Sequence, residues 1–293
     1  MRMTGLQDIR QWAKNARPVF ICGLERSGTS ILQLSLSRHP DLFAVKDVYE
    51  TFVFVKPRAV LENPPPHMVL AYLQGKGNAE RFRHLVASLA PDVDEVSDAD
   101  LIRAFFYFNA HEVYGGRRPL EKTPGHVRRI KRMLELFPQA KVIVCTRDPV
   151  SIVASYWKRL AAEKALGKGE ESWGWMDKTA EQLIAHFQDI TDHIVQARAL
   201  WPQQLFVAPY DWITDRPEES LRALCAFAGL PFVHQIMQPK EVMGREVDLL
   251  LSAPITKRDP DDDKFVDAQT QQLIRKSTQS LEAIWSTPGL QGS

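Results

Sequence analysis

Residues 19–32 constrain the fold more than any other part of the chain. An apolar run at residues 19–22 is followed by a turn with two glycines, Gly23 and Gly28, and then by a second apolar pattern with helical spacing. This order predicts a strand, a tight loop and a helix, an arrangement that binds phosphate on backbone N–H groups at a helix N-terminus. A strand-to-helix turn that binds nothing is the alternative that these residues leave open.

The loop departs from the nucleotide-hydrolysing pattern GxxxxGK[ST] at one position. The spacing from Gly23 to Gly28 agrees with the pattern, but Thr29 stands where the lysine belongs, and Arg26 is the only cation in the loop. In a triphosphate site that lysine contacts the β- and γ-phosphates. Its absence favours a ligand that places one phosphate-like group at this loop.

Composition sets the class of protein and its surroundings. The 293 residues are 44% hydrophobic and 25% charged, which is typical of a folded domain, and a net charge of +1 gives no overall field for nucleic acid. The three cysteines lie far apart in apolar contexts, which predicts buried free thiols in a reducing compartment. Residues 1–17 lack an apolar core and no stretch of about 18 apolar residues follows, so we expect a cytoplasmic protein without a membrane span.

Strands alternate with helices along the chain. Nearly continuous apolar runs at 19–22, 141–146 and 205–208 are typical of strands in a parallel sheet that is covered on both faces. The sequence therefore predicts a three-layer α/β/α fold with a mostly parallel central sheet, in which ligands bind at the carboxyl ends of the strands. We expect one domain over residues 1–293.

Several expectations concern helices. Thr123 and Pro124 fit the cap and first position of one helix, residues 161–175 fit either a mobile lid or a surface loop, and residues 176–200 fit a long amphipathic helix. His186 and His193 are expected on the surface of that helix. Its expected inward residues are Leu183, Ile184, Phe187, Ile190, Ile194 and Val195.

A second group of polar residues follows strand 141–146. Arg147 comes directly after the strand, and Asp148 and Pro149 fit the N-cap and first position of the next helix. Helical spacing then places three more polar residues on one face: Ser151, Ser155 and Arg159. Two cations and two hydroxyls near a helix start predict a second anion site.

Together the two sites resemble the motifs of sulfotransferases that use 3′-phosphoadenosine 5′-phosphosulfate (PAPS). Residues 25–30 resemble their 5′-phosphosulfate loop, and Arg147 with Ser155 resembles their 3′-phosphate motif. The likeness is closest to the tyrosylprotein-type and bacterial sulfotransferases and covers about residues 18–232. It therefore implies a domain core at 18–232 and a tail at 233–293 that completes the site. Four more segments share it: His39-Pro40-Asp41, Glu121-Lys122-Thr123-Pro124, residues 137–141 and Tyr210-Asp211.

The resemblance implies a P-loop NTPase-like fold and specific nucleotide contacts. It implies that the 5′-phosphate and sulfonate bridge are held by Arg26, Ser27, Gly28, Thr29 and Ser30, and the 3′-phosphate by Arg147 and Ser155. By likeness to the tyrosylprotein-type branch, Arg159 and Tyr210 would also reach the nucleotide. A packed strand-end aromatic is the alternative for Tyr210.

Sulfonate transfer to a hydroxyl is an in-line displacement at sulfur that needs no metal. Cations must stabilise the leaving phosphate, and Arg26 and Lys122 are the candidates, the latter by analogy with a lysine of the tyrosylprotein-type branch. A surface lysine beside a helix cap is the alternative for Lys122.

The reaction also needs a base for the hydroxyl proton. An ungapped count from His39-Pro40 puts Asp47 at the position of the base in the tyrosylprotein-type branch, whereas the pattern Glu50-Thr51 favours Glu50. We favour Glu50, because a longer carboxylate side chain next to an apolar wall can reach an acceptor. Asp47, His126 and His39 stay open as alternatives, and so does the possibility that the two acids only form ion pairs with Lys46 or Lys56.

The sequence thus predicts a PAPS-dependent sulfotransferase acting on a hydroxyl of a small molecule, lipid or carbohydrate, with residues 42–116 and 160–180 around the acceptor. A P-loop kinase or NTPase is one alternative, against which Thr29 speaks, and a non-catalytic nucleotide-binding protein is another. No nucleic-acid partner is expected, and the sequence leaves homo-oligomer formation open.

Overall fold

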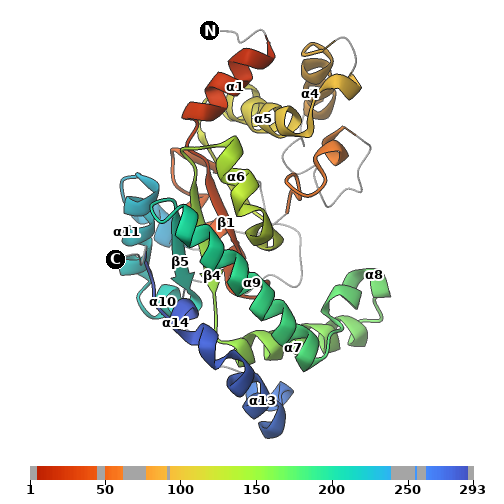
Figure 1. Cartoon of the computed structure of the whole chain (residues 1–293), viewed down its shortest axis with the longest axis vertical. Helices are drawn as coiled ribbons and strands as arrows, with labels where there is room; N and C mark the ends of the chain where they lie inside the picture. The colour runs from red at the N-terminus through yellow and green to blue at the C-terminus, as the bar shows by residue number, and fades with distance from the viewer. Residues whose placement is uncertain are drawn as a thin grey trace.

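The structure, a computed structural model, describes residues 5–44, 50–61, 77–90, 93–238, 255 and 262–289. Its centre is a five-stranded sheet in which every neighbouring pair is parallel, in the order β2-β3-β1-β4-β5 (Figure 1). The strands are β1 (Val19–Gly23), β2 (Leu42–Ala44), β3 (Arg118–Lys122), β4 (Lys141–Thr146) and β5 (Leu205–Pro209).

Helices cover both faces of this sheet. One face carries α1 (Leu6–Asn15), α4 (Asn78–Ala87), α5 (Asp98–Phe108), α6 (Ile130–Leu136), α7 (Pro149–Ala165) and α9 (Ala180–Leu200). The other carries α2 (Thr29–Leu36) and α11 (Pro217–Ala228), with α10 (Tyr210–Asp215) beside them. Within the described residues, four more α-helices follow: α8 (Glu170–Trp173), α12 (Asp262–Phe265), α13 (Ala268–Thr278) and α14 (Glu282–Trp285). The 3-10 turns flanking the site are η1 (Pro57–Val60), η4 (Pro124–Arg129) and η5 (Gly174–Met176).

Successive residues of the central strands point alternately to the two faces of the sheet, which explains why helices form a layer on each side of it. In β1, Phe20 and Cys22 pack into the core beneath α9, whereas Val19 and Ile21 pack into the core beneath α2 and α11. Because successive strand residues point to opposite faces, a run that is apolar throughout must be covered on both sides. The predicted three-layer fold with a parallel sheet is therefore confirmed.

The strand register brings the chemically important ends together. Within the parallel pairs, Ile21 of β1 lies opposite both Lys122 of β3 and Ile143 of β4, and Gly23 lies opposite Cys145. The segments that follow β1, β3 and β4 consequently leave the same edge of the sheet. This edge holds both anion sites that the sequence predicts.

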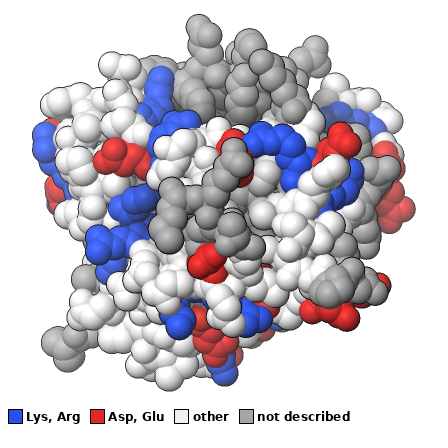
Figure 2. Space-filling view, turned by 90° about the horizontal axis from the view of Figure 1, so that it is seen from above, with Lys and Arg blue, Asp and Glu red and all other residues white. Residues whose placement is uncertain are grey.

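Charges of both signs are distributed over the surface. Figure 2 shows lysine and arginine side chains interspersed with aspartate and glutamate on the face seen from above. This distribution agrees with the net charge of +1. Among the described helices, none combines the length and the apolar composition needed to cross a membrane.

Three expectations about helices are corrected. Residues 161–175 are largely helical, because α7 continues to Ala165 and ends only before Gly167, whose φ is +68°. The long helix begins at Ala180 rather than at residue 176, because Thr179 and Gln182 form a capping box. Val195, expected inward, is 45% exposed.

The expectation about the cysteines is confirmed, since all three are buried free thiols. The aromatic residues at 105–108 are buried as well. Burial raises the pKa of the Cys145 thiol to about 12, as expected for a sulfur atom that packs and does not react.

Candidate active site

The loop after β1 has a tightly fixed backbone. Gly23 has φ +132°, and a Cβ atom there would lie 2.1 Å from the carbonyl oxygen of Cys145 on the neighbouring strand. The buried hydroxyl of Ser27 lies 2.6 Å from the Leu24 carbonyl oxygen and 3.1 Å from that of Cys145. Between these anchors Arg26 takes a φ of +69°, which is uncommon for a residue with a side chain. The Ser27 side chain thus shapes the loop from inside.

The two predicted anion sites are in direct contact. Nε of Arg26, in the loop, donates a hydrogen bond to the Ser155 hydroxyl of α7 at 3.0 Å. Arg147, after β4, donates from Nη1 to the Arg26 carbonyl oxygen at 3.3 Å. Residues that are about 120 positions apart therefore form one continuous cationic site at the carboxyl edge of the sheet.

The start of α7 is built as the sequence predicts. The Asp148 carboxylate caps the helix by accepting a hydrogen bond from the Ser151 N–H at 2.9 Å, and Pro149 occupies the first turn. This cap fixes the direction of α7, on which Ser155 lies. Arg159, one turn further along, instead forms an ion pair with Glu163 at 3.4 Å.

Tyr210 connects the loop to Arg147. The Arg147 guanidinium lies over the Tyr210 ring, 4.3 Å from its centroid. On the loop side, a Cβ atom at Gly28 would approach Tyr210 Cδ2 to 2.7 Å. The ring is therefore in close contact with the glycine that begins α2, where the first N–H groups of the helix have no partner within the helix. Gly28 has φ +91° and serves as the N-cap of α2.

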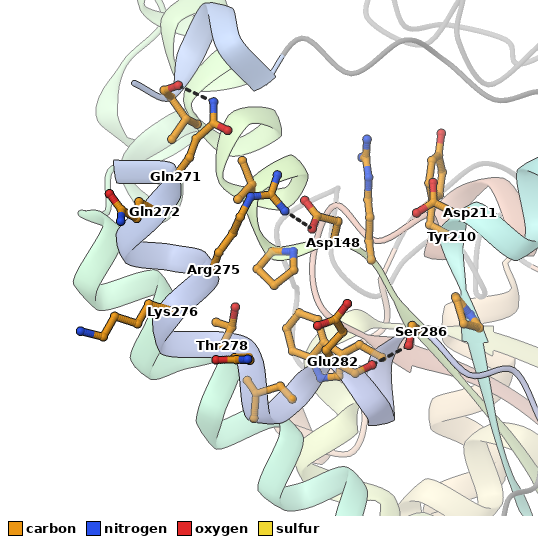
Figure 3. A pocket seen from close by; sticks show the side chains of 18 of the residues that line it. Asp148, Tyr210, Asp211, Gln271, Gln272, Arg275, Lys276, Thr278, Glu282 and Ser286 are labelled. Carbon is orange, nitrogen blue, oxygen red and sulfur yellow. Dashed lines mark hydrogen bonds and ion pairs between the residues drawn. The ribbon is translucent and has the colours of Figure 1, made fainter. Parts of the chain in front are cut away.

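A cavity of about 1170 Å³ opens beside this group. Its walls come from the start of α7, the β5–α10 junction, α13 and α14. Figure 3 shows Arg275 of α13 directed at Asp148, with Tyr210 and Asp211 nearby; the Arg275 Nη1 to Asp148 Oδ2 distance is 3.7 Å. The C-terminal helices thus line the same cavity as Arg147 and Tyr210.

On the opposite side of the loop, Lys122 and Glu50 form an ion pair. Lys122 Nζ donates to Glu50 Oε1 at 3.1 Å; the lysine side chain is 2% exposed and the glutamate 32%. Lys122 ends β3, next to β1, so its ammonium group lies at the carboxyl edge of the sheet. The alternative of a surface lysine is wrong. Asp47 lies outside the described residues.

Beside Lys122, a buried network centres on Glu121. Its carboxylate accepts hydrogen bonds from the hydroxyls of Thr51 (2.9 Å) and Thr123 (2.6 Å) and from His126 Nδ1 (3.1 Å). Burial alone would raise the pKa of this carboxyl, but His126 and the two hydroxyls outweigh burial and hold the pKa below its ordinary value. The Thr123 hydroxyl therefore donates to Glu121 and does not cap a helix as expected. The residues after Thr123 form the 3-10 turn η4, which precedes α6.

Both candidate histidines are used within the fold. The His39 side chain is fully buried, with Nδ1 accepting from the Asp41 N–H and Nε2 lying 2.8 Å from the Pro231 carbonyl oxygen. His126 is also fully buried and bonded to Glu121. Buried rings engaged in this way are poorly placed to take a proton from an acceptor, which favours Glu50 over both.

Sequence reasoning missed Glu25. Its carboxylate lies 2.9 Å from His186 Nε2 on α9 and accepts a hydrogen bond from the Tyr156 hydroxyl at 3.2 Å. Burial would raise the Glu25 pKa, but the hydrogen bond from His186 leads the effects that lower it below its usual value. His186 is thus no surface residue, since its side chain is only 12% exposed. A glutamate inside a loop that is predicted to bind an anion was the available signal, because a carboxylate in such a place needs a positively charged or hydrogen-bonding partner.

A single methyl group should test the contact between Gly28 and Tyr210. 3′,5′-Adenosine bisphosphate is the nucleotide that remains when PAPS gives up its sulfonate group. Gly28→Ala is expected to weaken its binding about tenfold or more, because the new Cβ displaces the Tyr210 ring and alanine disfavours a positive φ. Isothermal titration calorimetry measures the affinity. Gly116→Ala is the matched control: its φ is +86°, but no atom lies within 4 Å of its Cβ position. Equal affinities for both variants would contradict the steric role of Tyr210.

Comparison with known proteins agrees with this geometry. The model of the sulfotransferase family matches residues 18–234, which include the loop, Lys122, Arg147 and Tyr210. The chain belongs to the sulfotransferase family. The match ends close to residue 232, where the likeness recognised in the sequence also ends.

Two curated relatives and one solved structure illustrate the family. The chain is 25% identical over 258 residues to omega-hydroxy-beta-dihydromenaquinone-9 sulfotransferase Stf3 of Mycobacterium bovis, covering 73% of this chain and 63% of that protein. It is 24% identical over 226 residues to an uncharacterized protein of Aquifex aeolicus, covering 76% of this chain but only 26% of that one. The chain therefore spans less than two thirds of either relative.

The fold matches as well. The sulfotransferase domain from the curacin biosynthetic pathway superposes with a TM-score of 0.58 at 21% identity, covering 92% of this chain and 98% of that domain. A second sulfotransferase domain, from the Synechococcus PCC 7002 olefin synthase, gives 0.56 at 19% identity. At these identities the comparison shows the shared fold, and the roles of individual residues rest on the geometry of this chain.

Proposed function

We propose that this sulfotransferase moves a sulfonate group from PAPS to a hydroxyl of a small molecule, lipid or carbohydrate. The observation that carries the proposal is the contact between the two anion sites through Arg26, Ser155 and Arg147. A nucleotide with phosphate groups at both ends of its ribose needs two adjacent cationic sites. A nucleoside triphosphate needs only one, together with a lysine at position 29, where this chain has Thr29.

The proposed nucleotide contacts follow from this arrangement. Backbone N–H groups at Gly28, Thr29 and Ser30, with the Arg26 guanidinium, would hold the 5′-phosphosulfate at the start of α2. Arg147 and Ser155 would hold the 3′-phosphate, and the adjoining cavity has room for the adenosine. Ser27 would act through the loop backbone, because its hydroxyl is directed at two carbonyl groups. Tyr210 would border the nucleotide, and Arg159 would join it on leaving Glu163.

The donor supplies an activated sulfonate, and the residues around it supply proton and charge control. Glu50 takes the proton from the acceptor hydroxyl as the new S–O bond forms and the bond to the 5′-phosphate breaks. Arg26 and Lys122 stabilise the negative charge that this cleavage leaves on the phosphate. All three groups lie at the carboxyl edge of β1 and β3, and no metal takes part in the scheme.

The acceptor side of the site is partly apolar. The Trp175 ring packs edge-on against Tyr156 at 5.5 Å, and Tyr156 bonds to Glu25 in the loop. Trp175 and Val55 are both more than two fifths exposed, and each lies in a segment that the sequence predicts around the acceptor, so we propose that both contact it. The Stf3 relative is named for a menaquinone substrate. We therefore favour a hydroxyl on an apolar or aromatic molecule.

A thermal-shift experiment separates this function from the alternatives. 3′,5′-Adenosine bisphosphate without magnesium is expected to raise the melting temperature, because a ligand at about 100 times its Kd adds about 2.7 kcal/mol. If ATP with magnesium raises the melting temperature and 3′,5′-adenosine bisphosphate does not, the protein is a P-loop kinase or NTPase instead. Transfer of ³⁵S from labelled PAPS to hydroxylated acceptors then distinguishes an enzyme from a non-catalytic nucleotide-binding protein.

A further inference from the structure

We propose that Glu121, Thr123 and Thr51 are positioning residues that set the orientation of Glu50 for proton transfer. The proposal rests on the proposed function, in which Glu50 is the base. None of the three is expected to contact substrate, since each side chain is at most 2% exposed. They act through the backbone of residues 50–51.

The first observation is that consecutive residues of β3 hold consecutive residues of the segment 50–61. Lys122 donates to the Glu50 carboxylate at 3.1 Å, while the preceding residue, Glu121, accepts from the Thr51 hydroxyl at 2.9 Å. The Thr51 N–H donates in turn to the Thr123 hydroxyl oxygen at 3.2 Å. The backbone and side chain of Thr51 are therefore both tied to β3 and the residue after it.

The second observation is that every oxygen of the buried carboxylate is used. Glu121 Oε1 accepts both threonine hydroxyls, and Oε2 lies 3.1 Å from His126 Nδ1, which must donate to an ionised carboxylate. The His126 ring is packed edge-on against Phe54 at 5.1 Å, so the histidine is fixed as well. A buried carboxylate whose two oxygens both accept hydrogen bonds holds its donors in one geometry, even though His126 Nε2 has no hydrogen-bond partner among the described residues.

The third observation is that burial of apolar residues already fastens this segment. Val53, Phe54 and Val60 are each at most 2% exposed, and the Phe54 ring packs against Phe20 of β1. Attachment therefore does not require an ionised carboxylate, which is costly to bury. What apolar packing cannot supply is the direction of residues 50–51, which hydrogen bonds do fix. The hydrogen bonds from Glu121 and Thr123 can fix this direction because both are made to Thr51, the residue next to Glu50.

Chain geometry beyond Thr51 supports the same role. Phe52 has φ +50°, and its carbonyl oxygen accepts from the N–H groups of both Val55 and Lys56. The chain thus turns sharply directly after the held residue. A rotation at Thr51 would move Glu50 away from Lys122, and a displacement of about 1 Å at a reacting group costs up to about 10²-fold in rate.

The test is Thr51→Val, which keeps the shape of the side chain and removes its hydroxyl. The Thr51 N–H still reaches Thr123, so the segment stays attached. We expect turnover with PAPS to fall about tenfold or more, with affinity for 3′,5′-adenosine bisphosphate within about twofold of the wild type. Deuterium exchange at the amides of residues 51–53 should accelerate. Thr51→Ser restores the hydroxyl and should recover most of the turnover.

Ser220→Ala is the matched control, because it also removes a buried hydroxyl, one that donates to the Pro217 carbonyl oxygen on α11. It should leave turnover and exchange at residues 51–53 unchanged. Wild-type turnover in Thr51→Val, or no recovery in Thr51→Ser, would overturn the positioning role alone. If the wild type transfers sulfonate to none of the acceptors, the proposed function is overturned, and the positioning role of Thr51, Glu121 and Thr123 with it.

Discussion

Glu50→Gln is expected to lower turnover about 10²-fold or more while leaving affinity for 3′,5′-adenosine bisphosphate nearly intact. The amide keeps the size of the side chain but cannot take a proton from the acceptor. Glu50 pairs with Lys122 and takes no part in the contacts among Arg26, Ser155 and Arg147, so nucleotide affinity should depend little on its charge. Steady-state kinetics with labelled PAPS and calorimetry with the bisphosphate measure the two quantities.

Glu135→Gln is the matched control for this change. Glu135 belongs to α6, is more than half exposed, and faces Lys131 one helical turn away at 3.9 Å, so it loses the same charge outside the site. Its turnover should equal that of the wild type. If Asp47→Asn lowers turnover as predicted for Glu50→Gln, and Glu50→Gln does not, then Asp47 is the base.

Arg147→Ala is expected to weaken nucleotide binding by about 1.5–3 kcal/mol, the range for a charged hydrogen bond to a phosphate. This corresponds to an increase in Kd of about 10- to 150-fold. The substitution removes the proposed 3′-phosphate contact, the stacking on Tyr210 and the hydrogen bond to the Arg26 carbonyl oxygen. Calorimetric titration with 3′,5′-adenosine bisphosphate measures the loss.

Two comparisons show whether the phosphate contact causes that loss. Adenosine 5′-phosphate lacks the 3′-phosphate, so Arg147→Ala should change its affinity much less. Arg216→Ala removes a solvent-exposed arginine that is paired with Glu219 at 3.6 Å, and it should bind both nucleotides like the wild type. Equal losses for the two nucleotides in Arg147→Ala would point to the loop, rather than to the 3′-phosphate, as the origin of the effect.

Local patterns predicted the elements that carry the site. The strand at 19–22, the loop with Gly23 and Gly28, and the Asp148 cap are all found as expected, because each depends on residues that are close in sequence. Apolar runs on both faces of a strand also determine that the sheet must be covered twice. Family motifs then indicated which loops would bind the proposed nucleotide.

Partners of charged residues could not be predicted in the same way. Periodicity gives the helix that carries His186 but not the loop glutamate, 161 positions away, that it meets. Thr123 has the residue type and position of a helix cap, yet its hydroxyl donates a hydrogen bond to the Glu121 carboxylate instead. Such outcomes depend on which groups are buried together, because a buried carboxylate must be satisfied by whatever donors the fold supplies.

The placement of the C-terminal helices α13 and α14 also could not be predicted from local patterns. After Phe232 the sequence shows only weak periodicity, yet α13 and α14 line the cavity next to Arg147. Arg275 reaches Asp148 from a helix more than 100 residues further along the chain. No local pattern signals this placement, because it follows from packing of α13 on α7 and α9.

The sequence by itself determined the parallel α/β fold, the loop between β1 and α2 that lacks the lysine of nucleotide-hydrolysing loops, and membership in the sulfotransferase family, since local spacing and residue type carry this information. Only the tertiary structure decided that Arg26 joins Ser155 and Arg147, that Lys122 is buried against Glu50, and that Glu121 holds Thr51. The physical reason is that these contacts link distant segments. Their geometry is fixed by the register of β1, β3 and β4 and by the need to satisfy buried charge.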